Sequence, residues 1–349
     1  YYIMELKSIL FYNFRNFSYE SLDIRPGMNL IYGENGAGKT TFLEGLYLAL
    51  TGTVFKDTYY DLVKRDQTQA GVRAKFKEGV RDMEKIVYIK KDKGVLREIN
   101  DKRVGRIRNF KTHNAVVFEP YDTFIIDGSP GLRRRFLDDM IQDVSLSYEK
   151  NLRDFNNLYR LRNEYLQTAN PKFHLDLMDD DYIKLCQAIN HDRIKYMELL
   201  EKRTARHLYD IDPNWKVKFS IDYSWDRENP ASFRDQALAE DLRRRYSTWG
   251  VHKDDIVIEF NGQLAKSSAS RGQKRAIVVS MKLANLDILK RLSNRESIIL
   301  LDDLLYEFDS IRNANLENKI KGMTAFVTST SLMDADAIIE IKDNKMKYL

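Results

Sequence analysis

The first third of the chain alternates apolar and polar positions with the two-residue period of β-strands that bury one face. We expect strands at residues 3–11 and 19–24, followed by a series at 72–77, 85–90 and 97–99. Short polar turns separate the members of this series, which therefore predicts an antiparallel meander. A further apolar strand at 115–118 ends at Pro120.

The pattern becomes helical from residue 132 to about residue 209, where apolar residues recur every three or four positions. Asn170-Pro171 interrupts this stretch, so we expect two long antiparallel helices, each about 30–40 Å long at 1.5 Å per residue. We interpret their apolar stripes as packing seams rather than as grooves for a partner. The two helices would form an arm.

The rest of the chain returns to strands and then alternates strands with helices. The alternating strand at 256–260 meets Asn261-Gly262, which is a strong hairpin signal. Continuous apolar strands between helices predict a buried parallel sheet. We expect a strand at 216–223, a helix at 235–246, a helix at 273–289, a strand at 297–301, a helix at 312–320 and a strand at 324–328.

The fold class is therefore predicted to be α/β, a head with an antiparallel meander and an inserted helical arm. The head would be discontinuous, comprising residues 1–125 and 245–349, and the arm would comprise residues 126–244.

Composition narrows the classes of protein that fit. The chain has 349 residues, is 43% hydrophobic, and carries a net charge of +5, which permits an anionic partner without requiring one. Cys186 is the only cysteine, which excludes a disulfide framework and a cysteine zinc site. No apolar run approaches the roughly 18 residues of a membrane span. We expect a cytoplasmic protein that does not enter a membrane.

Residues 33–40 fit the phosphate-binding pattern G-x-x-x-x-G-K-[ST] at every fixed position. A short apolar strand precedes this loop and an amphipathic helix follows it, an arrangement that aims backbone N–H groups at an anion. We expect Lys39 to reach the β- and γ-phosphates of ATP and to be exposed without them. Thr40 would bind Mg²⁺. The loop consists of Gly33, Glu34, Asn35, Gly36, Ala37, Gly38, Lys39 and Thr40.

The apolar strand at 297–301 ends in two acids, Asp302 and Asp303. Solvated acids at a strand end are the simpler interpretation, but the P-loop favours a functional one. We expect Asp302 to contact Mg²⁺, directly or through water, and Asp303 to orient and deprotonate the attacking water.

The segment Ser270-Arg271-Gly272-Gln273 opens a helix, and alone it indicates only a capped helix. Its place between the P-loop and the paired acids resembles the ATP-binding-cassette family. This resemblance implies that the predicted α/β head is a P-loop ATPase head of the ABC type. That resemblance implies that Ser270, Gly272 and Gln273 bind the γ-phosphate held by the opposing subunit. It also places Glu307-Phe308-Asp309 across the interface of a head-to-tail dimer with two composite ATP sites.

Motifs in family order across nearly the whole chain narrow this resemblance to the bacterial RecF proteins of replication, recombination and repair. They include Phe14-Arg15-Asn16-Phe17, the P-loop, Gly128-Ser129-Pro130, the run from Arg133 to Asp138, His252-Lys253-Asp254-Asp255, and the segment from Leu300 to Asp309. The resemblance implies a cytoplasmic, weak DNA-dependent ATPase that dimerises on ATP. It also implies DNA binding at gaps and single-strand/double-strand junctions, and partnership with RecO and RecR in loading RecA. Arg15, Asn16 and Thr41 would complete the nucleotide site.

Two positions depart from the wider cassette pattern. Glu119 follows the strand at 115–118 where a lid glutamine is usual, and Thr328 stands where transporter ATPases keep a switch histidine. These departures leave open how the attacking water is positioned.

Four basic clusters are candidates for sequence-independent contacts with DNA phosphates. Each is equally well interpreted as a solvated face paired with nearby acids. The clusters are Arg133-Arg134-Arg135, Arg243-Arg244-Arg245, Lys64-Arg65, and Arg103, Arg106, Arg108 and Lys111.

Three other functions share most of these motifs. A transporter nucleotide-binding subunit is disfavoured by the missing histidine and by the inserted arm. An SMC-like head ATPase of another DNA-repair complex would carry coiled coils of hundreds of residues, and only about 80–90 helical residues fit here. An ATP-gated DNA clamp, in which hydrolysis is incidental, shares every motif with the enzyme.

Overall fold

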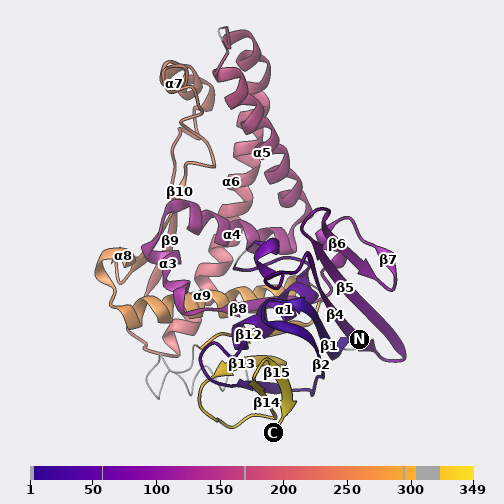
Figure 1. Cartoon of the computed structure of the whole chain (residues 1–349). Helices are drawn as coiled ribbons and strands as arrows, with labels where there is room; N and C mark the ends of the chain where they lie inside the picture. Colours follow the sequence, from indigo (N-terminus) through magenta and orange to yellow (C-terminus); the bar gives the residue numbers. More distant parts are fainter. Residues whose placement is uncertain (1–3, 57, 169, 294, 304–322) are drawn as a thin grey trace. The chain divides into compact units, whose positions relative to one another are not determined.

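The computed structural model describes residues 4–56, 58–168, 170–293, 295–303 and 323–349 (Figure 1). The chain divides into two compact units. The first, here called the P-loop unit, comprises Tyr1–Pro120 and Asn294–Leu349, and the second, the helical unit, comprises Tyr121–Ser293. The predicted helix at 312–320 and the segment Glu307-Phe308-Asp309 lie outside the described residues.

The predicted antiparallel meander is present in the P-loop unit as part of a sheet with the strand order β2-β1-β4-β5-β6-β7. A tight turn at Arg15-Asn16 joins the first two strands, and Arg15 has a φ of 48° there. The strands are β1 (Met4–Phe14), β2 (Phe17–Asp23), β4 (Gln69–Glu78), β5 (Arg81–Lys90), β6 (Gly94–Ile99) and β7 (Lys102–Arg103).

The predicted parallel sheet is also present, with the strand order β15-β14-β3-β13-β12-β8. Five adjacent strands of this sheet, from β14 to β8 in that order, run parallel to one another, and β15 pairs with β14 at one edge as an antiparallel strand. The strands are β3 (Met28–Tyr32), β8 (Asn114–Phe118), β12 (Ser297–Leu301), β13 (Ala325–Ser329), β14 (Ala337–Lys342) and β15 (Lys345–Tyr348). We did not predict the β14–β15 hairpin, although Asp343-Asn344, at φ of 52° and 59°, is a recognisable turn between alternating segments.

Helix α1 (Lys39–Thr51) packs between the two sheets of the P-loop unit. The fully buried ring of Phe42 lies 5.6 Å from Phe11 of the antiparallel sheet and 6.0 Å from Phe326 of the parallel sheet. The sheets and α1 therefore share one core, which fixes the start of α1 against the carboxyl ends of the parallel strands. Two short helices, η1 (Tyr59–Leu62) and α2 (Ile107–Phe110), complete the unit.

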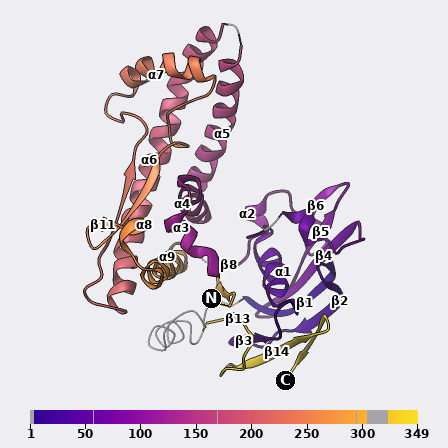
Figure 2. The same cartoon turned by 60° about the vertical axis from the view of Figure 1, so that its left-hand side comes forward.

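The arm of the helical unit consists of α5 (Leu146–Leu166) and α6 (Lys172–Tyr209), which lie side by side (Figures 1 and 2). The 38 residues of α6 span about 57 Å at 1.5 Å per residue, so this helix is longer than the predicted 30–40 Å. Cys186 is fully buried on α6, and burial raises the pKa of its thiol to about 12. Helix α4 (Pro130–Val144) packs against both long helices, after the short η2 (Pro120–Thr123) and α3 (Phe124–Asp127).

Residues 245–293 belong to the helical unit by their contacts, whereas the sequence placed them in the head. Strand β10 (Asp255–Phe260) pairs with β9 (Val217–Asp222) and with β11 (Gln263–Leu264) through the predicted turn at Asn261-Gly262. After the short α8 (Ala265–Ser268), helix α9 (Arg271–Leu292) packs along α6, where Tyr196 Oη donates to Asn285 Oδ1 at 2.6 Å. The order of motifs along the sequence does not show that α9 packs beside α6, and this packing is what places residues 245–293 in the helical unit.

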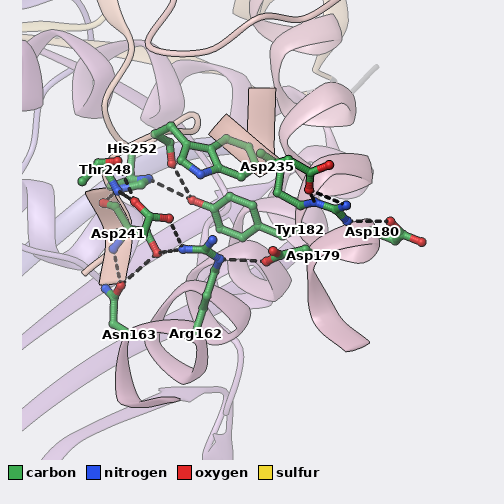
Figure 3. Close-up of polar contacts among 12 residues, drawn as sticks. Arg162, Asn163, Asp179, Asp180, Tyr182, Asp235, Asp241, Thr248 and His252 are labelled. Atoms are coloured by element: carbon green, nitrogen blue, oxygen red, sulfur yellow. Dashed lines mark hydrogen bonds and ion pairs between the residues drawn. The ribbon is translucent and has the colours of Figure 1, made fainter. Parts of the chain in front are cut away.

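A buried ionic network, here called the Arg162 network, ties α7 (Pro230–Arg244) to the arm (Figure 3). The fully buried guanidinium of Arg162 on α5 donates to Asp179 of α6 at 2.9 Å and to Asp241 of α7 at 2.7 Å. Asp241 also accepts from the backbone N–H and hydroxyl of Thr248. One cation thus connects three helices and the segment that follows α7.

Candidate nucleotide site

The P-loop has the backbone geometry of an anion cradle. Gly36 and Gly38 have φ of 82° and 112°, in the left-handed region that favours glycine. Helix α1 starts directly after Gly38, with no side chain capping its N-terminus and no acid in its first turn. The positive end of the α1 dipole therefore faces the loop, where it favours an anion.

Lys39 is not exposed, contrary to the prediction. Its side chain is buried, and its ammonium donates to the carbonyl oxygens of Gly33 at 2.9 Å and Glu34 at 3.0 Å. An ammonium has three donors, so the loop itself provides partners for the charge when no phosphate does. Lys39 thus holds the loop in shape as well as carrying a charge for phosphate oxygens.

Asn16 lies directly against the P-loop, as the RecF-like motif suggests. Its Nδ2 donates to the Ala37 carbonyl at 3.4 Å and to Asn344 Oδ1 at 2.8 Å. A Cβ on Gly38 would lie 2.8 Å from this amide nitrogen, so only glycine fits there. Sequence reasoning missed Asn344, which belongs to the unpredicted β14–β15 turn.

Arg15 points to α1, and its guanidinium pairs with the buried carboxylate of Glu44 at 2.7 and 2.8 Å. This bidentate pair fastens the β1–β2 turn to the helix that follows the P-loop. The structure therefore places Arg15 beside the site through Glu44, while Thr41 lies buried in the first turn of α1.

The P-loop threonine and the first strand-end acid meet as predicted. Thr40 Oγ1 donates to the two carboxylate oxygens of Asp302 at 3.0 and 3.1 Å. Burial, and then the charge of Asp303, raise the pKa of the Asp302 carboxyl, while hydroxyls of Thr328 and Thr40 oppose the shift. A buried carboxylate beside a hydroxyl suits Mg²⁺, which takes few protein oxygens and keeps several waters.

Thr328, at the end of β13, joins the two acids from the position where transporter ATPases keep a switch histidine, although the sequence did not predict these contacts. Its fully buried hydroxyl lies 3.0 Å from Asp302 Oδ1 and accepts the Asp303 backbone N–H at 2.8 Å. Asp303 has a φ of 47°, so the hydroxyl supports a turn that a residue other than glycine rarely adopts. Thr328 thus fixes the backbone that carries Asp303.

Glu119 comes directly after β8, the strand beside β12 in the parallel sheet. The Phe118 carbonyl accepts the Asp302 N–H at 2.9 Å, so the chain at Glu119 leaves the sheet next to the paired acids. The strand ends therefore gather Gly33, Glu119, Asp302 and Thr328 at one edge, where ligands of open parallel sheets bind.

The Ser-x-Gly-Gln segment forms a capping box at the start of α9 in the helical unit. Ser270 Oγ accepts the Gln273 N–H at 3.3 Å, and Gln273 Oε1 accepts the Ser270 N–H at 2.8 Å. Ser270 is exposed, and Gly272 follows it in the first turn. The structure thus groups the three predicted residues in a unit other than the one that carries the P-loop.

The basic clusters differ sharply in burial and pairing. Arg133 is buried and forms a bidentate ion pair with Asp255, with both N···O distances at 2.8 Å, so it cannot contact DNA. The exposed Arg243 and Arg244 share Glu240 on the same helix. Lys64 donates to the Asn16 carbonyl and to Ser18 Oγ beside the first hairpin. Arg103 and Arg106 are exposed.

The described residues contain neither a metal cluster nor a membrane-spanning helix. Nowhere in those ranges do three or more His, Cys, Asp or Glu side chains gather as a metal cluster would. Among the helices that the structure describes, none combines the length and apolar character needed to cross a membrane.

Comparisons with known proteins agree with this geometry. The family model described as an AAA domain matches residues 8–345. The DNA replication and repair protein RecF of Streptococcus equi subsp. zooepidemicus (strain H70) is 29% identical over 344 residues, which cover 94% of this chain and 92% of the relative. A structure of the recombination mediator protein RecF with ATP, in the RecFOR pathway, has a TM-score of 0.93 and 27% identity, covering 100% of this chain and 98% of that one.

A more distant likeness shows the fold alone. The Smc head bound to the C-winged helix domain of ScpA has a TM-score of 0.58 at 15% identity, covering 99% of this chain and 96% of that one. The predicted α/β head of the ABC type is therefore confirmed. The chain belongs to the AAA domain family, and the resemblance to bacterial RecF that its motifs predict is confirmed over 94% of its length.

Proposed function

We propose that this protein is an ATP-dependent DNA-binding protein of recombinational repair. In this proposal ATP and Mg²⁺ drive a head-to-tail dimer that clamps DNA at gaps and single-strand/double-strand junctions. Slow, DNA-dependent hydrolysis releases the dimer. The partners are RecO and RecR, which act with it in loading RecA, and the compartment is the cytoplasm. The ATP and pathway assignments are supported by the RecF relatives whose names carry them.

The observation that carries the proposal is the contact between Thr40 and Asp302. It joins the P-loop to the strand-end acid at 3.0 Å, across 262 residues of sequence. A hydroxyl and a carboxylate at this spacing, beside a helix N-terminus without a capping side chain, suit a nucleotide with its magnesium ion.

Each residue has a definite role in this proposal. Lys39 exchanges its two backbone carbonyls for phosphate oxygens, and Thr40 and Asp302 hold Mg²⁺. Mg²⁺ neutralises charge on the phosphates when it is bound. Asp303 takes the proton of the attacking water. Asn16 and the backbone of residues 33–41 surround the phosphates.

The test is ATP binding measured by titration calorimetry, with and without Mg²⁺. We expect Lys39→Met to remove ATP binding, and Thr40→Val to weaken binding mainly when Mg²⁺ is present. Lys64→Met is the matched control, because this lysine also donates to a backbone carbonyl near the P-loop yet has no role in the proposal. Undiminished ATP affinity in a folded Lys39→Met protein would refute the site.

The shared site has its own test. If Ser270 acts across the dimer, a mixture of Ser270→Arg and Lys39→Met should recover part of the ATPase activity that each mutant lacks. One site of the mixed dimer then has both functional residues, and the other has neither. No recovery, with mixed dimers shown to form, would place the whole site within one subunit.

A further inference from the structure

A polar groove runs along one face of α4 in the helical unit and has no role in nucleotide binding. Its volume is about 260 Å³. From α4 it is lined by residues spaced as one helical face, namely Gly131, Arg134, Arg135, Asp138, Asp139 and Gln142. This face spans the 12 residues from Gly131 to Gln142, which is about 16 Å at 1.5 Å per residue. The opposite wall comes from α5, α6 and the segment around His252.

The three consecutive arginines of the RecF-like run from Arg133 to Asp138 differ in their relation to the groove. Arg133 points away from it and pairs with Asp255 on β10. Arg134 and Arg135 face the groove. The triplet therefore combines one structural arginine with two that line a cavity, a division that the sequence alone does not show.

Neither groove arginine has a carboxylate partner in the described part of the chain. Arg135 is exposed, and Arg134 is half-buried with one bond, from Nη1 to the Asp254 carbonyl at 2.6 Å. Burial, and next the charge of Arg193, lower the pKa of the Arg134 guanidinium, while the charges of Asp138, Asp255 and Asp254 oppose the shift without bonding to it. A half-buried cation without a bonded anion is costly unless a ligand supplies one.

The other charged groups of the groove largely cancel. Arg193 at the groove floor is held by Asp138 at 2.9 Å through two bonds, and by the Val251 carbonyl. His252 is uncharged at neutral pH, since burial lowers its pKa to about 4. With Asp139, the lining carries three arginines against two aspartates. The planar guanidinium groups of Arg134 and Arg135 therefore have N–H donors available, and their paired donors suit the oxygen atoms of a phosphate.

We propose that the α4 groove binds the phosphodiester backbone of a nucleic acid through Arg134 and Arg135. This inference rests on the proposed function and makes it specific, since it selects one of four basic clusters as the DNA contact. Phosphate contacts fix the position of a nucleic acid without reading its sequence. The arginines paired with Asp255 and Glu240 then serve the fold.

The experiment measures the affinity of the ATP-bound protein for a gapped DNA duplex at several salt concentrations. Each lost phosphate contact lowers the slope of log affinity against log salt by about 0.9 on duplex DNA. We expect Arg135→Gln to lower the slope by about one, equally on unrelated sequences, and Arg134→Gln/Arg135→Gln to lower it by about two. Arg135 is exposed and without a bonded partner, so its replacement leaves folding intact.

Arg245→Gln is the matched control, because Arg245 is also exposed and has no carboxylate partner in the described residues, yet it does not line the groove. An unchanged slope in Arg135→Gln, or an equal fall in Arg245→Gln, would refute the groove while leaving the proposed function standing. Absence of DNA binding by the unmodified protein would instead refute the proposed function. A last measurement is the binding of inorganic triphosphate to the unmodified protein and to Arg135→Gln. If Arg135→Gln weakens triphosphate binding and leaves DNA binding unchanged, the groove binds a free phosphate and the proposal is overturned.

Discussion

The nucleotide site and the Arg162 network are both polar and buried, but their polar groups are satisfied in different ways. In the network, Arg162 has two carboxylates and the Ser247 hydroxyl around it, all from the protein itself. At the nucleotide site, the Lys39 ammonium has only backbone carbonyls, and the Asp302 carboxylate has only hydroxyls. The first arrangement is closed except at Arg162 Nη2, which has no hydrogen-bond partner in the described part of the chain. The second leaves charges whose best partners are a phosphate and a cation.

This difference distinguishes polar groups that stabilise the fold from polar groups that are available to a ligand. Buried charges paired with each other connect elements, as Arg162 connects α5, α6 and α7. A buried charge without a bonded counter-charge is not by itself a ligand site, since the fully buried Lys85 ammonium donates to the Leu50 carbonyl and to Thr112 Oγ1 within the core. At the P-loop such charges coincide with an anion-binding backbone, and in the α4 groove with an open cavity, so we assign a phosphate ligand to each.

The largest effect is expected at Asp303. Asp303→Asn keeps the shape of the side chain but removes the base, so hydrolysis should slow by about 10²–10⁴ while ATP binding persists. The measurement is single-turnover hydrolysis beside calorimetric ATP binding. Near-normal turnover would move the base elsewhere, with Glu119 as the next candidate.

The Arg162 network gives the next largest effect. Arg162→Met leaves two buried carboxylates without their cation, and should lower the free energy of unfolding by about 3–5 kcal/mol. Arg243→Met removes an exposed ion pair with Glu240 and should cost at most about 1 kcal/mol. Denaturant unfolding of both variants measures the contrast, and equal losses would contradict the distinction between closed and open sites.

The pH dependence of stability sharpens the comparison at His252, whose ring centroid lies 4.2 Å from that of Tyr159 at an interplanar angle of 41°. Burial depresses its pKa from 6.5 to about 4, so the folded protein binds fewer protons than the unfolded chain in that window. This stability is present above about pH 6.5 and is lost as pH falls toward 4, by up to about 3 kcal/mol at 1.4 kcal/mol per pKa unit. His252→Gln should flatten the dependence, and exposed His191→Gln should not. Parallel curves for wild type and His252→Gln would contradict the assignment.

The smallest effect is expected at Thr328. Thr328→Val leaves the Asp303 N–H without its acceptor, at a cost of about 1–3 kcal/mol. If the hydroxyl positions Asp303, kcat should fall by about tenfold or more while KM for ATP changes little. Thr328→Ser retains the hydroxyl and should restore most of the rate. A serine variant as slow as the valine variant would show that the methyl group, not the hydroxyl, matters.

The sequence predicts contacts that local patterns encode. The P-loop, the β10–β11 turn and the Asp302-Asp303 strand end all lie where their patterns place them, because each depends on neighbours within a few residues. Asn344 and the Arg162–Asp241 pair were not predicted, because no motif links their positions. The Thr40–Asp302 contact, across 262 residues, was predicted because both residues belong to a nucleotide-site pattern. The prediction that Lys39 is exposed was wrong for a related reason. A sequence pattern does not show which carbonyl oxygens surround its ammonium group.

The central claim is that ATP closes two copies of this chain around sites built from Lys39, Thr40 and Asp302. The most direct test is the molar mass in solution, by light scattering, with no nucleotide, with ATP alone, and with ATP and Mg²⁺. We expect monomers in the first case, dimers in the last, and long-lived dimers for Asp303→Asn; Lys39→Met should stay monomeric throughout. A mass that ATP and Mg²⁺ do not change, or a Lys39→Met protein that dimerises on ATP, would contradict the account.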